Sequence, residues 1–199
     1  MIVGLTGGIA SGKTFCSDYL HNQYDAAVVD ADVIAREVVQ PGSEGLSAIV
    51  TAFGAQVLNT QGALDRAKLR AMMLADDAVR EALNTITHPR IRTLMLERIE
   101  QSAGAQPYQI LSVPLLFENH LHLHCQAVVV IDVDEATQLT RAMARDGAEE
   151  SAIRRMLAAQ LSRFDRLRQT NFVIDNGGSR QASEQQLDRL HDQLLLLAS

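Results

Sequence analysis

The chain of 199 residues contains few cysteines and no long hydrophobic run. Its two cysteines, Cys16 and Cys125, are far apart in the sequence and do not form the closely spaced pair of a metal site. Scarce cysteine is typical of proteins from a reducing cytosol. No apolar run approaches the length that crosses a bilayer, and the first residues already belong to an expected strand, which leaves no room for a signal peptide. We therefore expect a cytoplasmic protein without a membrane partner.

The sequence also lacks an excess of positive charge, because its formal net charge is −6. This charge argues against a general nucleic-acid-binding surface. Lysine is scarce: of 18 basic residues only Lys13 and Lys68 are lysines. The arginines are better suited to a few discrete anionic ligands than to a broad polyanion. With 47% hydrophobic residues and no internal repeat, the chain suits one α/β domain with insertions.

A phosphate-binding pattern, Gly-x-x-x-x-Gly-Lys-Thr, runs from Gly7 to Thr14. Its glycines let backbone N–H groups point at phosphate oxygens, and the following helix adds the positive end of its dipole. Lys13 can reach the β- and γ-phosphates, and the Thr14 hydroxyl can ligate Mg²⁺. The alternative is a chance glycine turn before a helix. The residues expected to contact ATP here are Gly8, Ile9, Ala10, Ser11, Gly12, Lys13, Thr14 and Phe15.

Five apolar runs are predicted to be buried strands: residues 2–6, 26–29, 109–113, 127–133 and 172–174. Helical patterns separate each run from the next. This alternation predicts an α/β fold with a parallel five-stranded sheet flanked by helices, which places ligands at the carboxyl ends of the strands.

Two insertions interrupt this alternation. About eighty residues separate the second and third strands, far more than a crossover helix needs. They contain helical patterns near residues 43–53, 65–74 and 76–86, and a further helix opens at His88-Pro89. We predict a nucleotide-binding core of residues 1–31, 107–133 and 169–199, a helical acceptor-binding region of residues 32–106, and a helical lid of residues 134–168. A last helix, from near residue 183, is expected to pack against the core.

Two aspartates follow the second strand, at Asp30 and Asp32. In an extended chain they point to opposite sides, so only one faces the reaction centre. Asp32 can accept the proton of an acceptor hydroxyl and hold a Mg²⁺ water, while Asp30 can cap the following helix. The alternative is that both are helix caps.

Arg141 and Arg145 are spaced i, i+4, so on a helix they share one face. Brought over a triphosphate, they would neutralise charge on the transferred group. The alternative is a solvated charged face. Whether Arg154, Arg155 and Arg163 support them or form surface salt bridges stays open.

Other polar residues follow the later strands. Asp132 ends an apolar strand, as does the Mg²⁺-orienting aspartate of many phosphate-loop enzymes. Glu118 can support the acceptor or a metal, and the turn at Asn176-Gly177 either reads an adenine edge or is a plain turn. The alternating histidines His120, His122 and His124 form either a metal site or a solvated connector.

In combination these motifs resemble the dephospho-coenzyme A kinase family. The matching segments are residues 5–9, 30–32, 36–42, 88–89, 114–118, 141, 145–146, 158–160 and 175–178. The resemblance implies a P-loop NTPase-type fold and transfer of the ATP γ-phosphoryl group to the ribose 3′-hydroxyl of dephospho-CoA, with Mg²⁺. One departure is Phe15, where many relatives have a second small hydroxyl residue.

The motifs and the resemblance together give expected roles for individual residues. By resemblance, Asp32 corresponds to the proposed base, and Thr6 and Arg141 to active-site groups near the phosphates. The expected catalytic residues are Asp32, Lys13 and Arg141. ATP contacts are expected from the phosphate loop and from Arg145, Asn176 and Gly177. Acceptor contacts are expected from Thr6, Asp32, Arg36, His88, Leu115 and Glu118. Thr14 would ligate Mg²⁺, with Asp32 acting through water. The expected partners are ATP and dephospho-CoA, in a monomer or weak homo-oligomer. The rival functions are a nucleotide or nucleoside kinase and a nucleotide-dependent switch.

Overall fold

The computed structural model describes residues 1–199, with the side chain of Leu74 left out. The chain forms two compact units. The first consists of Met1–Val29 and Gln101–Ser199, and the second of Asp30–Glu100. Residues 134–168, the predicted lid, belong to the first unit. No helix among the described residues has both the length and the apolar character that a membrane crossing requires.

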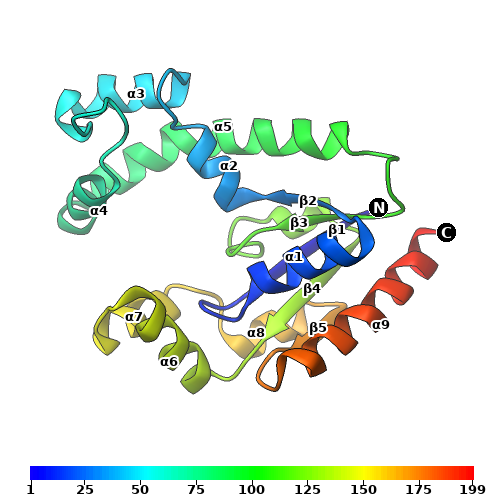
Figure 1. Ribbon diagram of the computed structural model, residues 1–199. Helices are drawn as coiled ribbons and strands as arrows, with labels where there is room; N and C mark the ends of the chain where they lie inside the picture. The colour runs from blue at the N-terminus through cyan, green and yellow to red at the C-terminus, as the bar shows by residue number, and fades with distance from the viewer. The chain divides into compact units, whose positions relative to one another are not determined.

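The first unit is built on a five-stranded sheet with the order β2-β3-β1-β4-β5 (Figure 1). Its strands are β1 (Ile2–Gly7), β2 (Ala27–Asp30), β3 (Gln109–Ser112), β4 (Ala127–Asp132) and β5 (Phe172–Asp175). β1 pairs in parallel with β3 and β4, and β4 pairs in parallel with β5. Since parallel strands all end at the same edge, the residues that follow β1, β3, β4 and β5 converge there.

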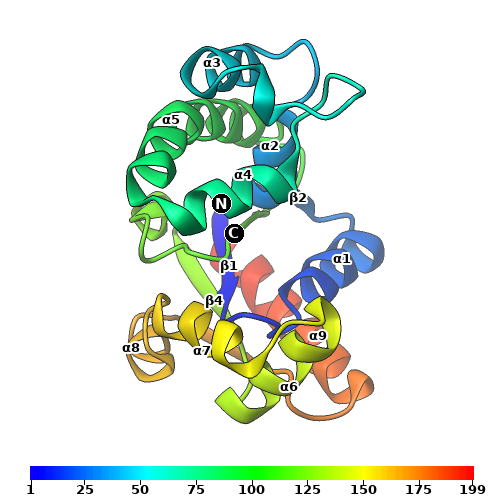
Figure 2. The same cartoon turned by 90° about the vertical axis from the view of Figure 1, so that its left-hand side faces the viewer.

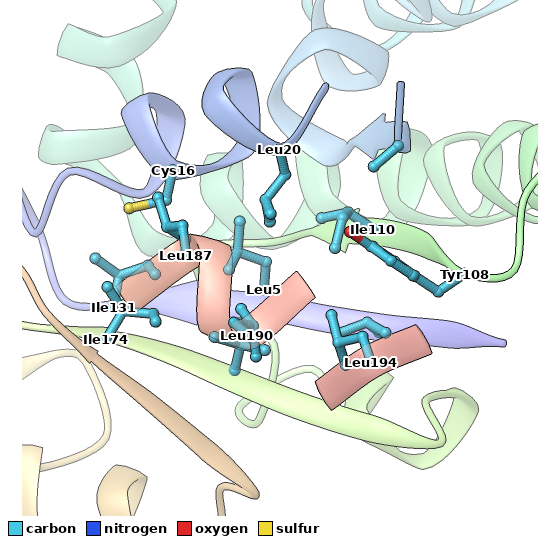
Figure 3. Packing of buried hydrophobic residues seen from close by; sticks show 13 residues of the cluster. Leu5, Cys16, Leu20, Tyr108, Ile110, Ile131, Ile174, Leu187, Leu190 and Leu194 are labelled. Carbon is cyan, nitrogen blue, oxygen red and sulfur yellow. The ribbon is translucent and has the colours of Figure 1, made fainter. Parts of the chain in front are cut away.

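Two helices, α1 (Lys13–Tyr24) and α9 (Arg180–Ala198), enclose the core of this unit on one face of the sheet. The other helices of this unit are η2 (Leu121–His124), α6 (Glu135–Asp146), α7 (Glu150–Ala158) and α8 (Arg163–Arg168). Figure 3 shows Leu20 of α1 and Leu187 of α9 pointing at Leu5 of β1. Because side chains alternate along a strand, Gly4 faces the other way and lies against Leu116. Burying each of these leucines stabilises the fold by about 1.5–3 kcal/mol.

The second unit is helical. Its elements are α2 (Ala31–Glu37), α3 (Glu44–Phe53), η1 (Ala55–Val57), α4 (Arg66–Ala75) and α5 (Asp77–Gln101). Three of these helices start at side-chain caps: Asp30, Ser43 and Asp65 each accept a hydrogen bond from a first-turn N–H group. Such caps satisfy donors that a helix leaves unpaired, and each contributes about 1 kcal/mol.

One prediction about this unit is wrong. The sequence was expected to form two helices with a new start at His88-Pro89, but α5 continues through Pro89 for 25 residues. Proline removes one backbone donor and disturbs the preceding turn. The carbonyl that loses its usual donor is that of Thr85, four residues earlier. Arg90 Nη1 donates to the next carbonyl, that of Ile86, at 2.7 Å, which adds a bond in the turn before the proline. The Thr87 hydroxyl also donates back, to the Leu83 carbonyl at 2.9 Å.

Candidate active site

The phosphate loop connects β1 to α1. Gly12 has a φ of 93° and Ala10 a φ of 55°, so the loop turns through left-handed conformations before Lys13 begins the helix. A Cβ on Gly7 would lie 2.6 Å from the Ile131 carbonyl oxygen of the neighbouring strand. A Cβ on Gly12 would overlap the Asn176 amide. Both glycines are therefore required by close contacts, and Gly12 is required by its positive φ as well.

Asn176, which directly follows β5, is hydrogen-bonded through its side chain to the phosphate loop and to α9. Its Nδ2 donates to the Ser11 carbonyl at 2.7 Å, and its Oδ1 accepts the Ser183 hydroxyl at 2.7 Å. The carbonyl of Asn176 in turn accepts Arg141 Nη2 at 3.1 Å. The structure thus brings together two residues that the sequence analysis selected separately, Arg141 and Asn176, at the phosphate loop.

Lys13 and Thr14 occupy the start of α1. The Lys13 ammonium donates to the Ser112 hydroxyl at 2.6 Å, so the side chain extends toward the carboxyl end of β3. Thr14 is exposed, and its hydroxyl makes no hydrogen bond within the described part of the chain. It is thus available to a ligand, as the sequence pattern predicts for the residue that holds Mg²⁺.

Three polar residues from the predicted lid contact the other side of the loop. Gln160 Oε1 accepts the Ile9 N–H at 3.0 Å. The Gln138 side chain, 2% exposed, lies against Gly8 and donates to the Val133 carbonyl at 3.1 Å. Arg166 also lies against Gly8. The sequence does not predict a role for these residues, because only the tertiary structure brings them to the loop.

Arg141 and Arg145 differ in their surroundings although both lie on α6. Arg141 contacts the carbonyl of Asn176, whereas Arg145 forms a two-point ion pair with the adjacent Asp146, at 2.7 and 2.8 Å. The hydrogen bond to Asp146 raises the pKa of Arg145. Figure 2 shows α6 beside α7, which together form much of the predicted lid.

Asp132, at the end of β4, is bound by an arginine. Arg163 donates to its carboxylate from Nε at 2.9 Å and from Nη2 at 2.6 Å. The hydrogen bonding to Asp132 raises the pKa of Arg163. Because the guanidinium takes both carboxylate oxygens, the geometry does not favour Asp132 as a Mg²⁺-orienting residue.

Two residues expected to contact the acceptor, Leu115 and Glu118, lie on the segment after β3, and a third, Thr6 of β1, is bonded to that segment. The buried Thr6 hydroxyl donates to the Pro114 carbonyl at 3.1 Å. Glu118 Oε1 accepts the Leu161 N–H at 2.7 Å, which ties this segment to the loop between α7 and α8. Leu115 is 37% exposed. Of the three, Leu115 has the side chain most open to solvent.

In the second unit, Asp30 and Asp32 differ in what their carboxylates contact. Asp30 is the cap of α2, accepting the N–H groups of Asp32 at 2.8 Å and Val33 at 3.2 Å. The Asp32 side chain is exposed in the first turn of the helix. The structure therefore confirms Asp30 as a helix cap and leaves the carboxylate of Asp32 accessible. Arg36 and His88 are exposed on α2 and α5.

The second unit also contains a cavity of about 760 Å³. Its lining is largely aliphatic, comes from α2, α3, α4, α5 and the turns between them, and includes Ile49, Leu69, Leu83 and Ile91. Arg66 and Arg70 of α4 add positive charge to its wall. Neither Arg36 nor His88 lines it. Its size lies within the range of small-molecule sites.

The three histidines lie in and beside η2. The ring of His122 packs against Phe117, with centroids 5.2 Å apart. His120 adopts a left-handed backbone conformation with a φ of 56°. The residues that the structure describes contain no cluster of three or more His, Cys, Asp or Glu side chains suited to a metal ion.

Comparison with known proteins decides the family. A family model described as dephospho-CoA kinase matches residues 1–182. A dephospho-CoA kinase of Vibrio vulnificus is 45% identical over 198 residues, which cover all of this chain and 97% of that protein. The chain belongs to the dephospho-CoA kinase family. The family resemblance drawn from the motifs is thus confirmed, and membership in the dephospho-CoA kinase family makes the chain an ATP-dependent kinase.

Solved structures confirm the predicted fold of this dephospho-CoA kinase family member. A dephospho-CoA kinase from Campylobacter jejuni superimposes with a TM-score of 0.75 at 23% identity, covering 100% of this chain and 98% of that one. A shikimate kinase from Bacteroides thetaiotaomicron gives a TM-score of 0.53 at 15% identity, with 98% of each chain covered. The five-stranded parallel sheet with a phosphate loop is therefore a fold shared with other small-molecule kinases.

Proposed function

We propose that this chain transfers the γ-phosphoryl group of ATP to the ribose 3′-hydroxyl of dephospho-CoA, which yields coenzyme A and ADP, the last step of coenzyme A biosynthesis. The observation that carries the proposal is the full-length match to dephospho-CoA kinases in a chain whose phosphate loop is complete. Lys13 and Thr14 start the helix directly after the loop, as phosphate binding requires.

The residues of the site supply the parts that phosphoryl transfer needs. Loop N–H groups and Lys13 bind the phosphates, and Arg141 neutralises charge that develops during transfer. The Asp32 carboxylate orients the acceptor hydroxyl and accepts its proton. Because the nucleophile is barely deprotonated in a loose transition state, orientation is the larger part of its contribution.

Thr14 is the residue that would hold Mg²⁺, together with the phosphate oxygens of the nucleotide. One exposed hydroxyl fits this ion, because Mg²⁺ in kinases usually keeps waters and substrate oxygens as most of its ligands. When bound, the ion would neutralise charge on the β- and γ-phosphates. A contribution of Asp32 through water belongs to the same proposal.

The helical unit is proposed to bind the acceptor. Its aliphatic cavity suits the pantetheine arm of dephospho-CoA, and Arg66 and Arg70 suit its pyrophosphate group. Arg36 and His88 offer exposed polar groups in the same unit. Residues 134–168 are proposed to act as a lid over the nucleotide. We further propose a cytoplasmic protein that needs neither nucleic acid nor membrane and is a monomer or a weak homo-oligomer.

A coupled assay of ADP release tests this function. The purified chain is supplied with MgATP and a panel of acceptors that contains dephospho-CoA, nucleosides and nucleoside monophosphates. ADP release with dephospho-CoA alone is expected. Turnover with nucleoside monophosphates and none with dephospho-CoA would favour the rival nucleotide kinase instead. ATP binding without turnover of any acceptor would favour a nucleotide-dependent switch.

A further inference from the structure

Arg166 of α8 is a buried cation with few partners. It is 5% exposed, and its Nη2 donates to the Leu161 carbonyl at 2.7 Å. Within the described residues this is the one hydrogen bond of its side chain. A guanidinium carries five N–H donors, so most of them lack an acceptor. Burial lowers the pKa of Arg166, which reflects the cost of keeping this charge away from water.

The carboxylates nearest to Arg166 are bound to other groups. Asp132 and Glu118 both act on it electrostatically. However, Asp132 is held at two points by Arg163, and Glu118 accepts the Leu161 N–H. An unpaired buried charge is destabilising unless something else compensates it. An anionic ligand would supply the missing acceptors.

The position of Arg166 beside the phosphate loop indicates the kind of anion that its guanidinium would bind. A Cβ on Gly8 would lie 2.9 Å from Arg166 Nη1, so the guanidinium abuts the first half of the phosphate loop. Arg166 also lines a cavity of about 310 Å³ together with Gln160, whose Oε1 accepts the Ile9 N–H. The other polar residues of this cavity are Glu135, Gln138, Arg154, Ser162 and Arg163, so its three arginines outnumber its one carboxylate. The cavity is thus cationic and adjoins the loop.

Lys13 and Arg166 approach the loop from opposite sides of β1. Lys13 extends toward Ser112 at the end of β3, whereas Arg166 lies beside the end of β4, where Arg163 holds Asp132. β3 and β4 are the two neighbours of β1 in the sheet. A phosphoryl group held at the loop between them would contact both cations.

We propose that Arg166 is a catalytic residue that binds the γ-phosphoryl group of ATP and stabilises it during transfer. This inference rests on the proposed kinase reaction and adds a residue to it. In that reaction the acceptor hydroxyl oxygen forms the new bond to the γ-phosphorus. The bond from this phosphorus to the β,γ-bridging oxygen breaks, and its electron pair stays on ADP. Asp32 takes the hydroxyl proton, and Arg166 donates hydrogen bonds to the γ-phosphoryl oxygens.

The test compares nucleotides that differ in the γ-phosphoryl group. The variants are Arg166→Met, which removes the charge, and Arg166→Lys, which keeps the charge but loses the planar donors. The control is Arg168→Met, which removes an exposed arginine two residues further along the chain, whose guanidinium lies over the Phe164 ring. Calorimetry measures the binding of MgADP and of a non-hydrolysable MgATP analogue without any acceptor. Steady-state kinetics and thermal unfolding complete the set.

For Arg166→Met we expect about tenfold weaker binding of the analogue and less than about twofold change for ADP. kcat should fall by about a hundredfold or more, because a donor to the transferred group is lost. Arg166→Lys should show the same pattern to a smaller degree. The stability of Arg166→Met should be unchanged or higher, since a buried, poorly paired charge is removed. Arg168→Met should match the parent protein in binding and turnover.

Two results would overturn the assignment. One is an equal loss of ADP and analogue affinity accompanied by a lower unfolding temperature, which shows a merely structural role. The other is an unchanged kcat in Arg166→Met. If Arg166→Met does not fold, the ratio of analogue to ADP affinity in Arg166→Lys decides. Because binding is measured without acceptor, a wrong acceptor assignment would leave this comparison intact.

Discussion

Replacing Asn176 with alanine tests whether the turn after β5 sets the geometry of the phosphate loop. The side chain makes two neutral hydrogen bonds of 2.7 Å, one to the Ser11 carbonyl and one from the Ser183 hydroxyl. Each such bond contributes about 0.5–1.5 kcal/mol to stability. We therefore expect the variant to lose about 1–3 kcal/mol of unfolding free energy. For a chain of this size a loss of about 2 kcal/mol lowers the unfolding temperature by about 4–8 °C.

Asn176→Ala should weaken nucleotide binding as well as lower the stability of the fold. The loop loses its anchor at Ser11, so ordering it around a triphosphate becomes less favourable. If ordering the loop on binding costs about 1 kcal/mol more in the variant than in the parent protein, the KM for ATP rises by about fivefold. Calorimetric titration with MgADP should show a similar loss, because the anchor acts on the loop rather than on one phosphate group.

Asn171 provides a matched control at the other end of β5. Its Oδ1 accepts the Val128 N–H at 2.8 Å, so Asn171→Ala also removes an asparagine contact to the backbone of a neighbouring segment. This variant should lower the unfolding temperature and leave the KM for ATP unchanged. If the two alanine variants change the KM for ATP equally, Asn176 does not position the loop, and the reasoning is refuted.

Three further outcomes are expected. Asp32→Asn should lower kcat by about a hundredfold or more in the coupled assay, with little change in ATP affinity. Asp30→Asn, which keeps a helix cap, should remain active. An unchanged kcat in Asp32→Asn would exclude Asp32 as the residue that orients the acceptor hydroxyl. Hydrogen bonds from Tyr24 and Tyr19 lower the pKa of Asp188. Its stabilising contribution is therefore present above the ordinary pKa of about 3.9 and is lost as pH falls through the lowered value. Acid unfolding curves should show a smaller decline in Asp188→Asn, and equal curves would contradict this. The hydrogen bond to Asp188 also raises the pKa of Tyr19 to about 12. The stabilisation of the fold by this bond is therefore complete below about pH 10 and is lost as the pH rises toward 12. Tyrosinate absorbance should rise at higher pH in the folded protein than in urea, and coincident titrations would count against this bond.

The elements predicted well from the sequence are those with a local signal. The phosphate loop, the apolar strands and the cap at Asp30 depend on residue types within a few positions of one another, and all lie where the patterns place them. The break expected at Pro89 was wrong because a helix can continue through a proline at the cost of one backbone hydrogen bond. Nothing local distinguishes this case from a helix start.

Contacts that cross the chain could not be predicted. Gln160 reaches Ile9 across 151 positions, and the Leu161 N–H reaches Glu118 across 43. A glutamine in a polar, arginine-rich stretch has many possible partners, so its composition gives no signal. In retrospect, Gly8 is a signal of these contacts, since a side chain at this position would displace Gln138 and Arg166.

The arginines show most clearly why sequence spacing alone does not identify the residues that bind phosphate. The i, i+4 rule places Arg141 and Arg145 on one face of α6, and this is correct as far as the helix goes. The rule does not say what each side chain meets. Asp146 follows Arg145 directly and pairs with it, whereas Arg141 reaches the turn at Asn176. Arg166, which no periodicity marks, is the more buried cation and the one that abuts the loop. Because charge acts on a phosphate through position and desolvation rather than through sequence spacing, a buried arginine with spare donors is stronger evidence of an anion site than a regular pair of less buried ones.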